Sequence, residues 1–207
     1  MNKPAGFDTT VFVNCPADEH YQPLLRAIVF TLLLCDFTPR SALQEFDGST
    51  VRLEKIKQLI ASSRFGIHDI SKTELDSHSG LPRFNMPFEL GLDLGAKAFG
   101  IEHLASKQML ILDSEPYRFQ RFLSDIAGQD IAAHNGCPEQ AVEQVRTWLN
   151  SINHTRQPLL GAVYILDRYR RFQTRLPKIC RRASLTLEML DLNDFIKLAS
   201  NWLQANV

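Results

Sequence analysis

The amino-acid sequence predicts a doubly wound α/β fold built on a five-stranded parallel sheet. Three observations lead to this prediction. Apolar, β-branched runs alternate with amphipathic helical patterns along the first three quarters of the chain. The central runs are apolar throughout, as strands buried on both faces are. The length of 207 residues suits one large domain better than two small ones.

The first β-α unit starts with an apolar strand at residues 10–16, TVFVNCP. An acidic pair, Asp18 and Glu19, follows it and suits the first turn of a helix over residues 19–34. The apolar residues of this helix recur at spacings of three and four and form its core-facing stripe: Tyr21, Leu24, Leu25, Ile28, Leu32 and Leu33.

The second and third units repeat the pattern. A short strand begins at Phe37, and a helix with one apolar face covers residues 51–61. The third strand, residues 64–71, ends on polar side chains. A polar loop over residues 72–83 leads to a helix within residues 87–100 that starts at Pro87.

Two further strands, at residues 107–114 and 130–134, complete the sheet, and Pro138 opens an amphipathic helix after the second of them. Strands joined by helices run parallel through right-handed crossovers, so helices cover the sheet. The default strand order is 2-1-3-4-5, the flavodoxin-like arrangement. We therefore expect a three-layer α/β sandwich over residues 1–153.

The remaining residues, 154–207, change character and predict a C-terminal helical extension. One helix covers residues 159–182, where Pro177 bends or ends it, and a second helix covers residues 187–205. We expect this extension to pack on the α/β domain or on a second subunit of a homo-oligomer, or to contact a partner protein.

The extension also carries the strongest local charge of the chain. The segment from Asp167 to Arg182 holds seven basic residues and one acidic residue, interleaved with Tyr169 and Phe172. Such a segment can grip a phosphate-rich partner such as nucleic acid. The alternative is a solvated helix face whose charges are paired with acids elsewhere in the chain or in a second subunit.

Composition limits the classes of function. Lys plus Arg and Asp plus Glu number 23 each, so no net charge draws the whole chain to nucleic acid or to an anionic membrane. The four cysteines form no C-x-x-C pair, which argues against a zinc or redox motif and fits a reducing compartment. The longest apolar run, residues 27–35, is too short to cross a bilayer, and the N-terminus lacks the apolar core of a signal peptide. We expect a cytoplasmic protein without a metal site or membrane span.

Open parallel sheets bind ligands beyond the carboxyl ends of their strands, where neighbouring crossovers leave on opposite faces. Asp69 is preferred to its neighbour His68, because adjacent strand residues point to opposite faces and only one can look into a given pocket. Cys15 also has the alternative of a buried structural thiol. The candidate binding residues at or near strand ends are Asn14, Cys15, Pro16, Arg40, Ser71 and Asp113. Arg83 and Asn85, close to the start of the helix after the third strand, are candidates for holding a phosphate or a base edge at the mouth of the cleft.

The stretch at residues 83–100, RFNMPFELGLDLGAKAFG, places Glu89 in the first turn of its predicted helix, at the same edge of the sheet. The alternative is that Glu89 has no catalytic role, because the helix dipole favours an acidic residue in any first turn. This stretch resembles the one that carries the catalytic glutamate of the nucleoside 2-deoxyribosyltransferase-like superfamily and of bacterial TIR-like nucleotide-binding domains. The resemblance covers about residues 10–114. It implies that Glu89 acts as nucleophile or oxocarbenium stabiliser when an N-glycosidic bond breaks, with Asp69 as the assisting acid.

Three functions stay open at this point. The first is an enzyme that cleaves the N-glycosidic bond of a nucleotide such as NAD, with a role in bacterial defence on the TIR-like side of the resemblance. The second is a sensor that binds a nucleotide or a nucleotide signal in the same cleft without cleaving it and acts through its helical tail. The third is a nucleic-acid-associated protein led by the basic segment. The chain lacks P-loop and dinucleotide-binding glycine motifs, so no cofactor is expected beyond the nucleotide itself.

Overall fold

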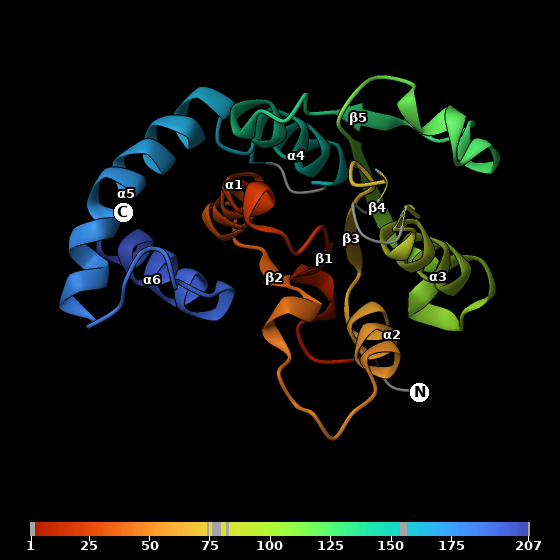
Figure 1. The fold of residues 1–207 in the computed structure, drawn as a ribbon, viewed down its shortest axis with the longest axis horizontal. Helices are drawn as coiled ribbons and strands as arrows, with labels where there is room; N and C mark the ends of the chain where they lie inside the picture. The colour runs from red at the N-terminus through yellow and green to blue at the C-terminus, as the bar shows by residue number, and fades with distance from the viewer. Residues whose placement is uncertain (1–2, 74, 76–79, 82, 154–156, 207) are drawn as a thin grey trace.

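The fold is built on a five-stranded, all-parallel sheet in the order β2-β1-β3-β4-β5 (Figure 1). The structure, a computed structural model, describes residues 3–73, 75, 80–81, 83–153 and 157–206. Its strands are β1 (Thr10–Asn14), β2 (Thr38–Arg40), β3 (Phe65–Asp69), β4 (Gln108–Asp113) and β5 (Ile131–Ala133). The predicted flavodoxin-like α/β fold and its strand order are confirmed.

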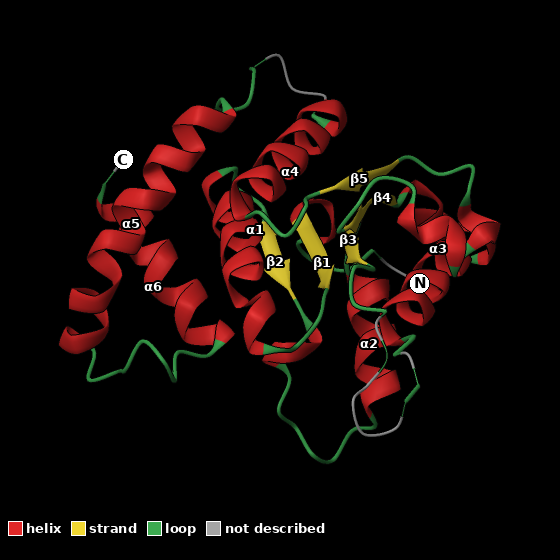
Figure 2. Ribbon diagram, turned by 45° about the horizontal axis from the view of Figure 1, so that its top comes forward, coloured by secondary structure: helices red, strands yellow, loops and turns green. Residues whose placement is uncertain are grey.

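Helices cover both faces of the sheet (Figure 2). They are α1 (Gln22–Leu34), α2 (Arg52–Ser62), α3 (Asn85–Phe99), α4 (Pro138–Ile152), α5 (Ala162–Arg182) and α6 (Leu192–Ala205). Helices α1 and α4 pack together on one face, and α2 and α3 pack on the other. Short 3₁₀ helices lie in the connections, at Phe7–Thr9, Glu19–Tyr21, Ala42–Gln44, Glu102–Ser106, Arg118–Arg121 and Ser124–Ile126.

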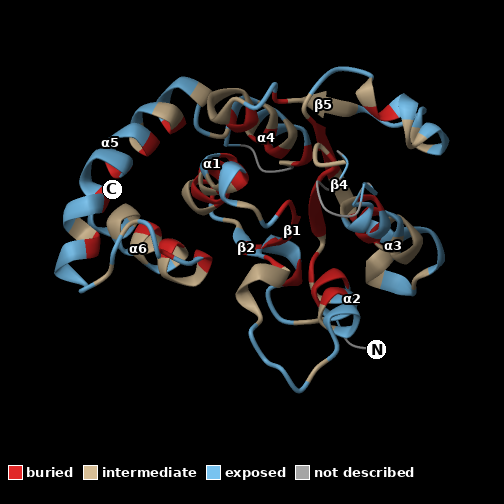
Figure 3. Ribbon diagram, in the orientation of Figure 1, coloured by how far each residue is buried: buried red, intermediate tan, exposed pale blue. Residues whose placement is uncertain are grey.

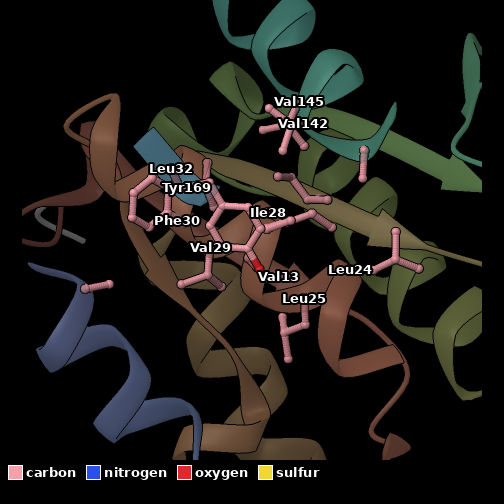
Figure 4. Packing of buried hydrophobic residues seen from close by; sticks show 14 of the residues in the cluster. Val13, Leu24, Leu25, Ile28, Val29, Phe30, Leu32, Val142, Val145 and Tyr169 are labelled. Atoms are coloured by element: carbon pink, nitrogen blue, oxygen red, sulfur yellow. The ribbon is translucent and has the colours of Figure 1, made fainter. Parts of the chain in front are cut away.

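Strand β1 is buried on both faces, and its successive residues divide between two parts of the core. Val11 and Val13 belong to the hydrophobic cluster of α1 and α4, whereas Phe12 packs with α2 on the other side. Figure 3 shows buried residues along the strands and on the inward sides of the helices, and Figure 4 shows Val13 among side chains of α1 and α4. An uninterrupted apolar run therefore marked a central strand, because side chains alternate across it.

The crossovers after β1 and β3 leave on opposite faces of the sheet. Helix α1 follows β1 to one face, and α3 follows β3 to the other. Because β1 and β3 are hydrogen-bonded neighbours, their carboxyl ends flank the point where the two connections diverge. Open α/β sheets bind ligands at such a point.

The C-terminal helices form a further layer outside α1 and α4 (Figure 1). Phe172 of α5 lies at its centre, with its ring centroid 5.3 Å from that of Phe30 on α1. The same ring lies 5.7 Å from Phe195 and 5.5 Å from Trp202, both on α6. These helices share one continuous hydrophobic cluster with α1 and α4. The extension therefore packs on its own chain.

Several predicted helix starts were wrong, and α1 and α5 begin at Gln22 and Ala162 rather than at residues 19 and 159. Helix α3 begins at Asn85 rather than at Pro87, because the N–H groups of a first turn have no partner within the helix and a proline there interrupts nothing. Glu89 consequently lies in the second turn, and the first turn holds no acidic residue. Helix α6 begins only at Leu192, where the Asp191 side chain accepts a hydrogen bond from the N–H of Asp194 and caps the helix.

Pro177 does not end α5, which continues to Arg182. A proline inside a helix leaves the carbonyl four residues earlier without its usual N–H donor. That residue is Gln173, which is exposed, so water can satisfy its carbonyl. The helix therefore tolerates the proline on its outer side.

Replacing Phe172 by Ala should lower the free energy of unfolding by about 3–5 kcal/mol, because a fully buried ring is removed and a cavity remains. Urea denaturation measures the change. Met189→Ala is the control, since this side chain is exposed and its truncation should change stability by less than about 0.5 kcal/mol. Equal effects of the two substitutions would contradict the packing of α5 described above.

Candidate functional site

A cleft of about 480 Å³ lies at the carboxyl edge of the sheet, where the connections after β1 and β3 diverge. We call it the switch-point cleft. It is lined by residues that follow β1, by one residue of α2, and by residues between β3 and the start of α3: Cys15, Pro16, Ala17, Asp18, Arg52, Lys72, Leu75, Arg83, Asn85 and Met86. Four residues selected from the sequence are among them, namely Cys15, Pro16, Arg83 and Asn85.

Among the described residues that line this cleft, basic side chains outnumber acidic ones. Arg52, Lys72 and Arg83 are basic, and Asp18 is acidic. The ammonium of Lys72 lies 3.4 Å from the Asp18 carboxylate. The described lining is therefore mostly basic, which favours an anionic ligand such as a phosphate.

Glu89 is buried beside this cleft, in the second turn of α3. Its Oε1 atom lies 4.0 Å from the guanidinium of Arg52, a residue that also lines the cleft. Burial raises the pKa of Glu89 to about 7, and the charge of Arg52 opposes this increase. A carboxyl group with such a pKa exists in both protonation states near neutral pH and can act as an acid or a base there.

Asp69 and His68 point to opposite faces of the sheet, as expected for adjacent strand residues. The carboxylate of Asp69 accepts hydrogen bonds from the hydroxyl of Tyr21 at 2.6 Å and from the N–H of Ser71 at 2.9 Å. Nε2 of His134, just after β5, lies 3.0 Å from the same carboxylate. Nδ1 of His134 accepts a hydrogen bond from the N–H of Gly136 at 3.0 Å, which fixes the orientation of the ring.

His68 lies on the same side of the sheet as α3, and its neighbours form a buried chain of contacts that sequence reasoning missed. The ammonium of Lys107 lies 3.1 Å from Oδ1 of Asp93 and donates to the carbonyl of Ile60 at 2.8 Å. The other carboxylate oxygen of Asp93 lies 2.9 Å from Nε2 of His68. Nδ1 of His68 is 3.0 Å from the amide nitrogen of Asn14. We call this set, Lys107–Asp93–His68–Asn14, the buried relay.

The buried relay ends at the start of α3. The amide of Asn14 donates to the carbonyl of Met86 at 3.0 Å, so its nitrogen also donates to His68 Nδ1. Nδ1 of His68 then accepts a hydrogen bond, and Nε2 is directed at the carboxylate of Asp93. This arrangement holds the first turn of α3 against β1, and it leaves Oδ1 of Asn14 without a donor in the described part of the chain.

A glycine in β3 is the sequence signal that marks this relay. A Cβ atom on Gly66 would lie 2.7 Å from Oδ2 of Asp93 and 2.8 Å from Nε2 of His68. Only glycine leaves room for this pair, which is a common reason for a glycine inside a strand. Gly91 and Gly95 of α3 have no such role, since a Cβ on either meets no described atom within 4 Å.

The thiol of Cys15 lies within electrostatic reach of both Asp69 and Glu89. Burial is the main cause that raises its pKa, and the charges of Asp69 and Glu89 add to the effect. Cys15 is therefore a protonated thiol in the wall of the cleft rather than an activated nucleophile.

The other candidates lie outside the lining of the cleft. Asp113 accepts a hydrogen bond from Nε of Arg118 at 2.8 Å, and Arg118 also donates to the carbonyl of Ser71 at 2.8 Å. Burial raises the pKa of Asp113, although Arg118 opposes this. Arg40 pairs with Glu45 at 2.6 Å and lines a separate small hollow on the side of α2. The structure does not bring Arg40 and Asp113 to the cleft.

A larger hollow of about 830 Å³ lies along β5 at the edge of the sheet. Its lining, as far as the structure describes it, contains none of the candidate residues and one carboxylate, that of Asp130. The smaller switch-point cleft is the better candidate site, because the charged groups and the carboxyl with a pKa near neutrality gather there.

Across the described ranges, no three His, Cys, Asp or Glu side chains come together in a way that could hold a metal ion. No helix within those ranges is long and apolar enough to cross a membrane. Comparison with known proteins found no match to the chain among protein-family models, curated proteins or solved structures.

Glu89→Gln should remove a pH dependence of stability. The folded chain holds a proton on Glu89 to a higher pH than the unfolded chain, so the free energy of unfolding falls as the pH rises from about 4.5 to about 7. The variant lacks this loss and should be more stable than the wild type above pH 7, by about 3 kcal/mol.

Urea denaturation across this pH range measures the difference between the two proteins. The exposed Glu143→Gln is the matched control and should follow the wild type. If the free energy of unfolding changed with pH in the same way for Glu89→Gln and the wild type, the pKa of Glu89 would not be raised by folding.

Lys107→Met should destabilise the chain by about 3–5 kcal/mol, because it leaves the carboxylate of Asp93 buried without its cation. Lys97→Met, at an exposed position of α3, should change stability by less than about 0.5 kcal/mol. Adding Asp93→Asn to Lys107→Met should recover part of the loss, as a double-mutant cycle by denaturation would measure. If the two substitutions change the free energy of unfolding in a strictly additive way, Lys107 and Asp93 do not interact.

Proposed function

We propose that the chain binds a nucleotide in the switch-point cleft and breaks its N-glycosidic bond with the help of Glu89. The observation that carries the proposal is a buried carboxyl, with its pKa raised to about 7, in contact with a cleft-lining arginine. The excess of basic side chains in the cleft suits the phosphates of a nucleotide. The resemblance of residues 83–100 to the glutamate segment of the deoxyribosyltransferase-like and TIR-like proteins supports the same residue.

The reaction breaks the bond between the anomeric carbon of the sugar and a nitrogen of the base. The electron pair leaves with the base, and water adds to the carbon as hydroxyl and releases a proton. An ionised Glu89 would stabilise the positive charge that develops on the sugar or accept that proton.

NAD fits this arrangement better than an ordinary nucleoside does. Its nicotinamide carries a positive charge and departs as a neutral molecule, so no acid has to protonate it. The carboxylate of Asp69 is engaged by Tyr21 and Ser71 on the other side of β3. The carboxylate of Asp18 in the cleft lining pairs with Lys72. Glu89 is therefore the carboxyl with a raised pKa beside the cleft. One carboxyl group is enough for such a substrate. An activity that consumes NAD would suit a role in bacterial defence.

A second candidate function is a sensor that binds the nucleotide without cleaving it. The burial of Glu89 favours this alternative, since its side chain is only 4% exposed and Arg52 stands beside it. The connection after β1 lines the cleft and leads into α1, against which α5 and α6 pack. A ligand in the cleft would act on the C-terminal helices through α1.

Incubation with NAD should release nicotinamide, and Glu89→Gln should lower kcat at least about 100-fold while NAD binding persists. If the ionised carboxylate is required, kcat of the wild type should rise with pH through about 7. Chromatography measures the released base, and calorimetry measures binding. A panel of nucleosides and other nucleotides tests the choice of substrate.

Glu143→Gln is the control and should retain full activity, because this exposed residue of α4 lies away from the cleft lining. Binding without release by the wild type would favour the sensor. Absence of binding to every nucleotide of the panel would contradict both functions.

A further inference from the structure

The outward side of α5 carries a straight row of positive charge. Arg171, Arg175, Lys178 and Arg182 follow one another at spacings of four, three and four residues, which places them on one side of a helix. At 1.5 Å per residue the row extends for about 16 Å. All four side chains are exposed, and α5 is the outermost helix on its side of the molecule (Figures 1 and 3). We call these four residues the basic row.

Most of this charge has no acidic partner in the described part of the chain. Arg171 pairs with Asp167 at 2.9 Å, one turn earlier on the same helix. No ion pair with a described acid involves Arg175, Lys178 or Arg182. The molecule is neutral as a whole, so any attraction that the basic row exerts on an anionic partner is local.

The opposite side of α5 is fully used by the core. Ile165, Tyr169, Phe172 and Leu176 are buried against the rest of the chain. The helix therefore cannot turn an apolar face into a lipid bilayer, as amphipathic membrane helices do. Only its charged side is available to a partner, and a line of cations is complementary to a polymer with regularly repeated anions.

We propose that the basic row binds the phosphate backbone of a nucleic acid, without reading its sequence. Nucleic acid carries closely and regularly spaced negative charges, and arginines bind phosphate oxygens in a bidentate manner. Tyr164 lies on the same side of α5, seven residues before Arg171, and is 48% exposed. Its ring can stack on an unpaired base, so a single strand binds at least as tightly as a duplex.

This surface is independent of the switch-point cleft. The basic row lies on α5, which packs outside α1 and α4, whereas α2 and α3 border the cleft from the other face of the sheet. Loss of nucleic-acid binding should therefore leave any ligand binding or turnover in the cleft unchanged. Equally, Glu89→Gln should leave nucleic-acid binding unchanged.

Fluorescence anisotropy with an oligonucleotide of roughly 20 nucleotides, single-stranded or as a duplex, tests the proposal at several salt concentrations. The logarithm of the association constant should fall with that of the salt concentration with a slope of about −3 to −4, as expected for four phosphate contacts. The double substitution Arg175→Ala and Lys178→Ala should lower the affinity at least about 10-fold at low salt and reduce the slope by about 2.

The matched control removes the same charge elsewhere, with Lys97→Ala and Arg121→Ala, two exposed residues outside α5. This variant should bind like the wild type, and thermal unfolding should show both variants to be as stable as the wild type. Equal weakening by both double substitutions would overturn the proposal. So would binding to phosphatidylserine vesicles with no binding to either oligonucleotide.

Discussion

The carboxylate of Asp93 lies fully buried between the ammonium of Lys107 and the imidazole of His68, and it ties helix α3 to the sheet. A buried charge is costly unless it is paired, so each member of this set constrains the others. The geometry leaves little freedom: Gly66 must lack a side chain, and Asn14 must donate to both His68 and Met86. The start of α3, one wall of the cleft, is thereby held against β1.

The two faces of β3 carry different polar groups at the same end of the strand. On the side of α3, His68 belongs to the buried relay, and Glu89 is shielded from water beside Arg52. On the side of α1 and α4, the carboxylate of Asp69 accepts hydrogen bonds from Tyr21 and Ser71. Nε2 of His134 lies close to the same carboxylate. The first arrangement leaves one carboxyl group poorly solvated, which raises its pKa, while the second surrounds a carboxylate with donors. Different environments therefore suit the two carboxyl groups to different tasks.

The C-terminal helices show how a neutral chain can present a charged surface. Aromatic packing of Phe172 against Phe30, Phe195 and Trp202 directs one side of α5 inward. The arginines and the lysine at the remaining positions then have to face water, where hydration satisfies them at little cost. A strongly amphipathic helix in the outermost layer thus combines a firm attachment with an exposed row of cations.

The sequence by itself determined the parallel sheet, its strand order and the edge at which the cleft lies, because apolar periodicity and crossover rules are local or topological. It also selected Asn14 and Cys15 at the end of the first strand, and Arg83 and Asn85 close to the start of the helix after the third strand. Only the tertiary structure decided that Lys107, Asp93 and His134 have buried polar partners and that Arg40 lies away from the cleft. Those outcomes depend on contacts between side chains of elements that are distant in the sequence, and the apolar periodicity of the sequence does not predict such contacts. The burial that raises the pKa of Glu89 is likewise a property of the packed molecule, since the same carboxyl in an unpacked helix would be solvated.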